Sequence, residues 1–261
     1  MSKLGKRVAV VTGASKGIGF AVARELAGQG ADTFLVARDG DRLAKAAARI
    51  EEETGRRSAY AAVDLATEAG CAEAAASATG QFARVDILVN NAGATRGGRF
   101  VSQPDADWID GFALKFHGAV RLTRLLWPEL ANRSGSVVNI GGGAARTPPP
   151  GFLVGGAVNA ALANFTKGLA ALGIEEDVNV NIVHPGMTVT ERMEDLLKAQ
   201  AADNGGDLDA VRSASMAREG TRRLGEPEDV AALVAFLCTP AARHIQGTAI
   251  AVDGGATRGL F

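Results

Sequence analysis

Short runs of aliphatic and β-branched residues recur along the chain, separated by longer stretches in which apolar positions repeat with helical spacing. Each run is continuous rather than alternating, which is typical of strands buried on both faces of a parallel sheet. Seven strands are therefore predicted, at residues 7–11, 33–37, 59–63, 87–90, 137–140, 180–183 and 249–252.

Helical periodicity fills much of the chain between these runs. Helices are predicted over residues 20–29, 42–53, 108–132, 159–172 and 227–239. Alternating strands and helices favour parallel strands joined by right-handed crossovers. The predicted fold class is α/β, a Rossmann-like doubly wound parallel sheet of about seven strands with helices on both faces. A chain of 261 residues, 47% of them hydrophobic, can bury one large core, so we expect a single domain over residues 1–261.

Two segments interrupt this rhythm. Residues 146–151 read RTPPPG, and consecutive prolines exclude helical conformation before one another, so this segment is predicted to be extended or turned. Residues 190–223 are long for a connection, which indicates a substrate lid with helices of its own. Both segments are expected to flank a ligand crevice.

Composition narrows the possible partners. Lys and Arg number 28 against 29 Asp and Glu, so no overall field attracts nucleic acid or an anionic membrane, and small-molecule ligands fit better. Cys71 and Cys238 lack the spacing of a zinc site or a redox pair. The chain has no signal-type apolar segment before the first strand and no apolar run of membrane-spanning length, which predicts a cytoplasmic protein.

The first predicted strand is followed directly by TGASKGIG at residues 12–19 and then by a helix. In this motif one glycine permits a tight turn, another lets the backbone approach a pyrophosphate, and the last allows close helix packing. The helix N-terminus adds favourable electrostatics for phosphate. The predicted phosphate-binding residues are Gly13, Ser15, Lys16, Gly17, Ile18 and Gly19.

The tip of the second strand bears on the choice of cofactor. Ala37 stands where NAD-preferring sites place a carboxylate, and Arg38 follows it. A guanidinium there can bind a 2′-phosphate, with Lys16 as a second cation, so the sequence favours NADP(H) over NAD(H). Two alternatives stay open: Arg38 as a solvated surface residue, and Asp39 as a ribose ligand if the alignment shifts by one residue.

With further segments, the chain resembles the short-chain dehydrogenase/reductase family over essentially its full length. The matching segments are TGASKGIG, Asp64-Leu65, NNAG at 90–93, VNIVHPG with Pro185-Gly186, Thr190, and the tail RRLGEPEDVAALVAFL with VDGG. The resemblance implies that Asp64 and Leu65 lie at the adenine. It also implies that Asn91, Ala92 and Gly93 follow the adenine ribose, and that Pro185, Gly186, Thr188 and Thr190 follow the nicotinamide.

Most members of that family use an Asn, a Ser and a Tyr-x-x-x-Lys pair. Counting back from AALANFTKGLA puts Asn159 at the lysine position, Gly155 at the tyrosine position and Gly142 at the serine position. The segment WIDGFALKFHGAVRL puts Lys115 at the asparagine position. The single tyrosine, Tyr60, lies in the third predicted strand, so no shift of register supplies a catalytic phenol. The resemblance thus implies an oxidoreductase fold without its usual catalytic groups.

Several residues are candidates to replace them. The glycines at 141–143 and 155–156 would widen the pocket, and the first run could form an oxyanion-binding nest or serve turn geometry only. Lys115 is the candidate catalytic residue, with ion pairing or space filling as the competing interpretation.

The remaining cations and imidazoles carry weaker signals. Arg146 and Arg192 could hold an acidic substrate, although solvated arginines are the default. His117, His184 and His244 do not cluster as a metal site, so none is predicted.

Two functional hypotheses follow. The first is an NADP(H)-dependent oxidoreductase with a nonstandard proton donor or substrate-assisted chemistry. The second is a cofactor-binding protein without redox turnover: a sensor, a scaffold or a non-redox enzyme. By analogy with the family, the helices around 108–127 and 158–172 are expected to form a homo-oligomer, a tetramer or a dimer.

Overall fold

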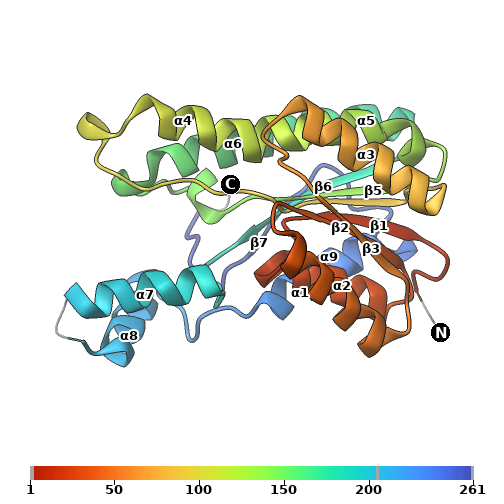
Figure 1. The fold of residues 1–261 in the computed structure, drawn as a ribbon. Helices are drawn as coiled ribbons and strands as arrows, with labels where there is room; N and C mark the ends of the chain where they lie inside the picture. The colour runs from red at the N-terminus through yellow and green to blue at the C-terminus, as the bar shows by residue number, and fades with distance from the viewer. Residues whose placement is uncertain (1–2, 204–205, 260–261) are drawn as a thin grey trace.

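The computed structural model describes residues 3–203 and 206–259, and its centre is a parallel sheet. The strand order is β3-β2-β1-β4-β5-β6-β7, so the direction of strand addition reverses after β3 (Figure 1). This order confirms the predicted doubly wound sheet of seven strands. The strands are β1 (Val8–Thr12), β2 (Asp32–Ala37), β3 (Ser58–Ala62), β4 (Ile87–Asn90), β5 (Ser136–Ile140), β6 (Asn179–Pro185) and β7 (Ala249–Val252).

Helices cover both faces of the sheet, as predicted (Figure 1). One face carries α1 (Gly17–Gly28), α2 (Gly40–Thr54) and α9 (Pro227–Leu237). The other carries α3 (Glu68–Phe82), α4 (Asp105–Gly111), α5 (Ala119–Ala131) and α6 (Leu153–Glu175). Two separate apolar cores result, one on each face, and their shared wall is the sheet. This double burial explains why β1, β4 and β5 are apolar without alternation.

The predicted helix 108–132 is a longer and less regular element. It runs from Asp105 to Ala131 and contains a π-helical segment, Phe112–Gly118, between α4 and α5. Pro128 lies inside α5, one turn from its end, without terminating it. The π segment contains Lys115, so this departure from regular helix falls at a predicted site residue.

The prediction for α6 was wrong at its start. The helix begins at Leu153, six residues before the predicted start, and includes the glycines at 155 and 156. Residues 146–151 precede it as turn, extended chain and the start of a 3-10 segment (Pro150–Phe152), which confirms the prediction for the proline run. Close packing against both glycines, described below, explains why these two helical positions carry no side chain.

The segment after β6 forms two helices, α7 (Glu191–Asp203) and α8 (Leu208–Glu219). They project from the body of the fold beside the end of the sheet (Figure 1). Among the described residues, no helix is both long and apolar enough to cross a membrane.

Candidate cofactor and active site

The loop after β1 has the backbone that a phosphate-binding turn requires. Gly13 and Gly17 have φ values of +63° and +58°, a region that L side chains rarely adopt. A Cβ atom at Gly19 would lie 2.3 Å from the carbonyl oxygen of Gly13. Gly19 is therefore required for the first turn of α1 to pack against the loop. The amides opening α1 face the carboxyl edge of the sheet, where an anion is favoured.

Asn91 braces this loop from the end of β4. Its Nδ2 donates to the carbonyl oxygens of Thr12 at 2.9 Å and Gly13 at 3.3 Å. Thr12 Oγ1 accepts from the amides of Asn91 and Ala92, each at 2.9 Å. The side chain of Asn91, which the family resemblance assigned to the ribose, is thus engaged in fixing the glycine loop.

A cavity of about 350 Å³ opens beside the glycine loop. Ser15, Val63, Leu65, Ala92 and Gly93 are among its lining residues. Three cations also line it: Lys16, Arg38 and Arg42. Sequence reasoning identified the first two and missed Arg42, although its position four residues after Arg38 was a usable signal. The cavity therefore combines a phosphate-type backbone loop with concentrated positive charge.

Two of these cations share one carboxylate. Glu191 Oε2, at the start of α7, lies 2.6 Å from Lys16 Nζ and 3.0 Å from Arg42 Nη1. The hydrogen bond from Lys16 is the main reason that the pKa of Glu191 is lowered from its ordinary value. Among the described residues, no carboxylate pairs with Arg38.

Asp39 has a local role. Its Oδ1 accepts from the Arg42 amide at 3.0 Å, which caps α2, and its Oδ2 lies 3.3 Å from Arg42 Nε. The alternative that made Asp39 a ribose ligand would compete with this helix cap. Arg38 and Asp39 both line the cavity, but the Asp39 carboxylate is engaged as the cap of α2, which favours Arg38 as the strand-tip residue that is available to a ligand.

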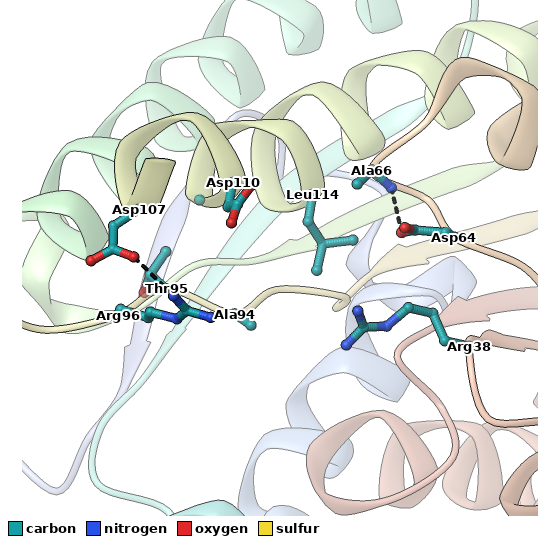
Figure 2. Close-up of a pocket in the computed structure, with 10 residues that line it drawn as sticks. Arg38, Asp64, Ala66, Ala94, Thr95, Arg96, Asp107, Asp110 and Leu114 are labelled. Atoms are coloured by element: carbon teal, nitrogen blue, oxygen red, sulfur yellow. Dashed lines mark hydrogen bonds and ion pairs between the residues drawn. The ribbon is translucent and has the colours of Figure 1, made fainter. Parts of the chain in front are cut away.

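A second cavity, of about 340 Å³, adjoins the first on the far side of Arg38. Figure 2 shows the Arg38 side chain extending into the space below Leu114 and Asp64. Asp64 Oδ1 accepts from the Ala66 amide at 3.0 Å. The predicted adenine residues Asp64 and Leu65 thus lie on adjoining cavities. Sequence reasoning missed the other side of this cavity: Thr95, Arg96, Asp107, Asp110 and Leu114.

A third cavity, of about 470 Å³, lies where β5 and β6 end. It brings together Gly142, Asn159, Pro185 and Gly186, four residues that sequence reasoning placed at the nicotinamide end. Asn159 is buried, and its Oδ1 has no hydrogen-bond partner among the described residues. The lining also includes Phe152, Met187, Met193, Arg218, Glu219 and Thr257, which sequence reasoning did not identify.

The two threonines predicted near the nicotinamide lie beside this cavity. Thr188 is buried, and its Oγ1 donates to the Gly186 carbonyl at 3.1 Å. Thr190 Oγ1 accepts from the Met193 amide at 3.3 Å, at the start of α7. A Cβ atom at Gly17 would lie 3.3 Å from the Thr190 methyl group. Thr190 therefore connects the glycine loop with the start of α7.

The expectation that the glycines widen the pocket was largely wrong. A Cβ atom at Gly155 would lie 2.0 Å from the Phe152 ring, and one at Gly156 would lie 2.8 Å from Pro148 Cβ. At Gly141 the same atom would meet His184 Nδ1 at 2.5 Å. Neighbouring side chains fill the volume that these glycines leave, because protein interiors pack closely. Of the five glycines at 141–143 and 155–156, Gly143 alone has room for a Cβ atom, which would lie in ordinary contact with Thr257 Oγ1 at 3.7 Å.

The predicted oxyanion nest also loses two amides. The Gly141 amide donates to the Val183 carbonyl at 2.8 Å, and the Gly142 amide donates to His184 Nδ1 at 3.0 Å. His184 is buried, and burial, followed by the charge of Arg146, lowers its pKa to about 4. The imidazole is therefore neutral at pH 7 and acts as an acceptor for the glycine run.

Lys115 packs against the backbone of the glycine residues Gly93 and Gly141. Its Nζ donates to the Gly141 carbonyl at 3.0 Å, and its aliphatic stem covers Gly93, where a Cβ atom would lie 2.7 Å from Lys115 Cδ. Lys115 does not line the 470 Å³ cavity. These contacts favour the space-filling interpretation over the catalytic one.

The remaining candidates do not line the three cavities described above, or their side chains are not among those that the structure describes. Arg146 Nη2 donates to the Ala249 carbonyl at 3.0 Å, and the Arg192 side chain is not among those the structure describes. His117 and His244 are exposed.

Cys71 and Cys238 are buried free thiols, and burial raises the pKa of Cys238 to about 12. Within residues 3–203 and 206–259, no three His, Cys, Asp or Glu side chains are grouped as a metal site.

A twisted parallel sheet with a glycine loop after β1 and cavities along its carboxyl edge defines a dinucleotide-binding α/β protein. A sequence model of the short chain dehydrogenases matches residues 7–201, and the chain belongs to this family. An uncharacterized oxidoreductase of Mycobacterium tuberculosis (strain CDC 1551 / Oshkosh) is 36% identical over 259 residues, which are 98% of this chain and 94% of the relative.

Solved structures agree over the whole fold. L-sorbose reductase from Gluconobacter frateurii, complexed with NADPH and L-sorbose, has a TM-score of 0.96 and 35% identity, and all of both chains is covered. A short chain dehydrogenase from Burkholderia cenocepacia J2315, in complex with NADP, has a TM-score of 0.85 and 34% identity, with 97% and 99% of the two chains covered.

Proposed function

We propose that the protein is an NADP(H)-dependent oxidoreductase of the short-chain dehydrogenase family with a nonstandard active site, acting on a small molecule. The observation that carries the proposal is the pair of contrasting ends along one edge of the sheet. Gly13, Gly17 and Gly19 form a cradle that side chains would block. The register of the family motif puts Gly142, Gly155 and Asn159 at the positions of the family's reactive side chains.

Charge supports the preference for NADP(H). Three cations face one cavity, and Arg38 among them has no carboxylate partner in the described part of the chain. A guanidinium binds phosphate through paired hydrogen bonds, so Arg38 is suited to the 2′-phosphate that distinguishes NADP from NAD. The similar structures bound to NADPH and NADP point the same way.

The residues of the chain also fit the other end of the cofactor. The unpaired Asn159 Oδ1 is a buried acceptor, and burying it without a hydrogen bond costs free energy. A ribose hydroxyl would satisfy it, which assigns to Asn159 the ribose contact made by the family lysine. Pro185, Gly186, Thr188 and Thr190 would follow the nicotinamide, and residues 190–223 would cover the substrate as a lid. When bound, the nicotinamide supplies or accepts a hydride.

The missing groups limit the chemistry. A positioned general acid or base contributes about 10²–10⁴-fold, so its absence removes roughly 3–5 kcal/mol of transition-state stabilisation. Gly155 offers no phenol, Gly142 no hydroxyl and Asn159 no ammonium. The proton in any carbonyl reduction would have to come from the substrate or from solvent, and such a reaction is expected to be slow.

One observation favours the alternative, a cofactor-binding protein without turnover. The Phe152 ring covers Gly155, so the volume that a tyrosine would use is filled by an unreactive side chain. A sensor or scaffold would need only the binding edge of the sheet.

Two measurements on the purified protein separate these functions. Fluorescence titration with NADPH and NADH tests binding, and we expect tighter NADPH binding. Absorbance loss of NADPH with a panel of small carbonyl compounds tests turnover. Binding with slow but protein-dependent oxidation supports the oxidoreductase, binding without oxidation supports the alternative, and binding of neither coenzyme refutes both.

A further inference from the structure

Glu191 lies where three elements meet at the cofactor edge. It opens α7, whereas Lys16 precedes α1 and Arg42 lies in the first turn of α2. A single oxygen, Oε2, accepts from both cations, at 2.6 Å from Lys16 and 3.0 Å from Arg42. Residues far apart in the sequence thus form one small ionic cluster.

The same two cations line the 350 Å³ cavity together with Arg38. Five charged side chains lie in or beside this cavity: Lys16, Arg38, Asp39, Arg42 and Glu191. Asp39 is engaged as the cap of α2, and of the five only Glu191 comes from the α7–α8 segment. The carboxylate of Glu191 therefore occupies the hydrogen-bonding positions that an anionic ligand in this cavity would use. All three charged groups are partly exposed, so a ligand can reach them without unfolding the segment.

We propose that Glu191 lowers the affinity for NADP(H), and so reduces the preference over NAD(H) that Arg38 supplies, by competing with the 2′-phosphate for Lys16 and Arg42. This inference rests on the proposed function. A 2′-phosphate entering the cavity meets Arg38 directly, but it gains Lys16 and Arg42 only by displacing the carboxylate. Glu191 thereby weakens binding of phosphate-bearing cofactors, while a cofactor that ends in ribose hydroxyls has no comparable competition.

The test uses adenosine fragments, so that it does not depend on turnover. Calorimetry with 2′,5′-ADP and with 5′-AMP is carried out on the wild type and on Glu191→Gln. An exposed ion pair is worth about two- to fivefold in an equilibrium constant, and two pairs share this oxygen, so we expect about three- to tenfold tighter binding of 2′,5′-ADP. The affinity for 5′-AMP should change by less than about twofold. The gain for 2′,5′-ADP should shrink as the salt concentration rises, because the charges are exposed.

Glu194→Gln is the matched control. Glu194 lies one turn further along α7 and pairs with Lys198 at 3.8 Å and Arg212 at 3.6 Å, both within the α7–α8 segment. This variant should leave both affinities unchanged. Unchanged or weaker 2′,5′-ADP binding in Glu191→Gln overturns the inference. If the wild type binds 5′-AMP as tightly as 2′,5′-ADP, and Glu191→Gln does not separate them, the NADP(H) assignment fails as well.

Discussion

Arg38 differs from its two cationic neighbours because no carboxylate in the described chain neutralises it. Replacing it with alanine should therefore remove the strongest contact for a 2′-phosphate. Hydrogen bonds to charged groups are worth about 1.5–3 kcal/mol, so Arg38→Ala should weaken NADPH binding about tenfold or more. NADH binding should change little. Fluorescence titration of both coenzymes gives the two dissociation constants.

Arg49→Ala is the control for this change. Arg49 lies on α2, is similarly exposed, and pairs with Glu53 at 2.6 Å away from the cavities. It should leave NADPH binding unaltered. Equal losses for NADPH and NADH in Arg38→Ala would contradict the assignment of Arg38 to the 2′-phosphate.

Gly19 is a position where one methyl group should have a large effect. The added Cβ in Gly19→Ala would lie 2.3 Å from a backbone oxygen of the glycine loop, which cannot move aside as a side chain can. Overpacking of this kind costs about 1–3 kcal/mol, occasionally more. We expect a loss of about 2 kcal/mol in urea unfolding, together with weaker NADPH binding. Gly28→Ala, in the same helix with no atom within 4 Å of its added Cβ, should lose neither.

His184 should make stability depend on pH. Its pKa is about 4 in the folded protein, against an ordinary value of 6.5, because the imidazole is buried. The unfolded chain binds more protons than the folded chain between these values, so stability is complete above pH 6.5 and falls as the pH approaches 4. The loss from this group by pH 4.5 is about 2–3 kcal/mol.

Urea unfolding of wild type and His184→Gln at pH 7 and pH 4.5 measures this contribution. Glutamine keeps an acceptor for the Gly142 amide but does not titrate, so the variant should lose less stability on acidification. His244→Gln, at an exposed histidine outside the cavity, should follow the wild type. Identical pH dependence in wild type and His184→Gln would refute the prediction.

Among the elements, β4, β5, α5 and α6 are joined by a buried chain of hydrogen bonds. Asn90 Nδ2 donates to Thr123 Oγ1 and to Asn139 Oδ1, each at 2.9 Å, and Asn139 Nδ2 donates to Thr166 Oγ1 at 2.8 Å. The hydrogen bond between Asn139 and Thr166 holds α6 against β5. Because α6 carries Asn159 and β5 leads to Gly142, this contact also helps to align the two lining residues.

A double-mutant cycle on Asn139→Leu and Thr166→Val tests the link between β5 and α6. Each buried polar group left unsatisfied costs about 1–3 kcal/mol, so Asn139→Leu should lose about 2–4 kcal/mol. Thr166→Val should cost less in the Asn139→Leu background than in the wild type, because the bond from Asn139 is already gone and only the bond from Thr166 Oγ1 to the Leu162 carbonyl is left to lose. Additive losses in urea unfolding would show that the two side chains do not depend on each other.

Most elements were predictable because their signals are local. Continuous apolar runs located all seven strands, and the order of strands and helices gave the doubly wound sheet. The start of α6 was not predictable in this way. Gly155 and Gly156 disfavour a helix locally, and the contacts that compensate come from Phe152 and Pro148 in the preceding loop. Tertiary packing thus overrode local preference.

In the candidate site, too, the residues with a local sequence signal were identified, and the contacts that depend on the fold were not. The glycine loop, Arg38 and Asn159 were found because a motif or a register identifies each of them. The filling of Gly155 by Phe152, the engagement of the Gly142 amide by His184, and the pairing of Glu191 with Lys16 were missed. Each joins residues whose proximity depends on the fold, or on a side-chain rotamer, and a linear pattern records neither.

Across the whole molecule, one edge of the sheet carries two separate regions: the cavity beside the glycine loop and the cavity that Gly142 and Asn159 line. The first is built by β1, β2 and the start of α1, and the second by β5, β6 and the start of α6. Residues 142, 155 and 159 lie beyond the strand ends, so the identity of their side chains does not alter the sheet or its glycine loop. The binding and catalytic properties can therefore vary separately, which is why binding and turnover need separate assays.

Large apolar side chains are exposed on the helical layer opposite α1 and α2. Leu125 on α5 is 45% exposed, and Leu172 on α6 is 39% exposed. We expect a homo-oligomer, a dimer or a tetramer of the 26.7 kDa chain, in which this layer is covered. Leu125→Glu should lower the mass measured by light scattering, because an interface would bury the new charge. Tyr60→Glu, at a 44% exposed position in β3, should not lower it. A wild-type mass equal to one chain would exclude this arrangement, and equal masses for wild type and Leu125→Glu would place the interface elsewhere.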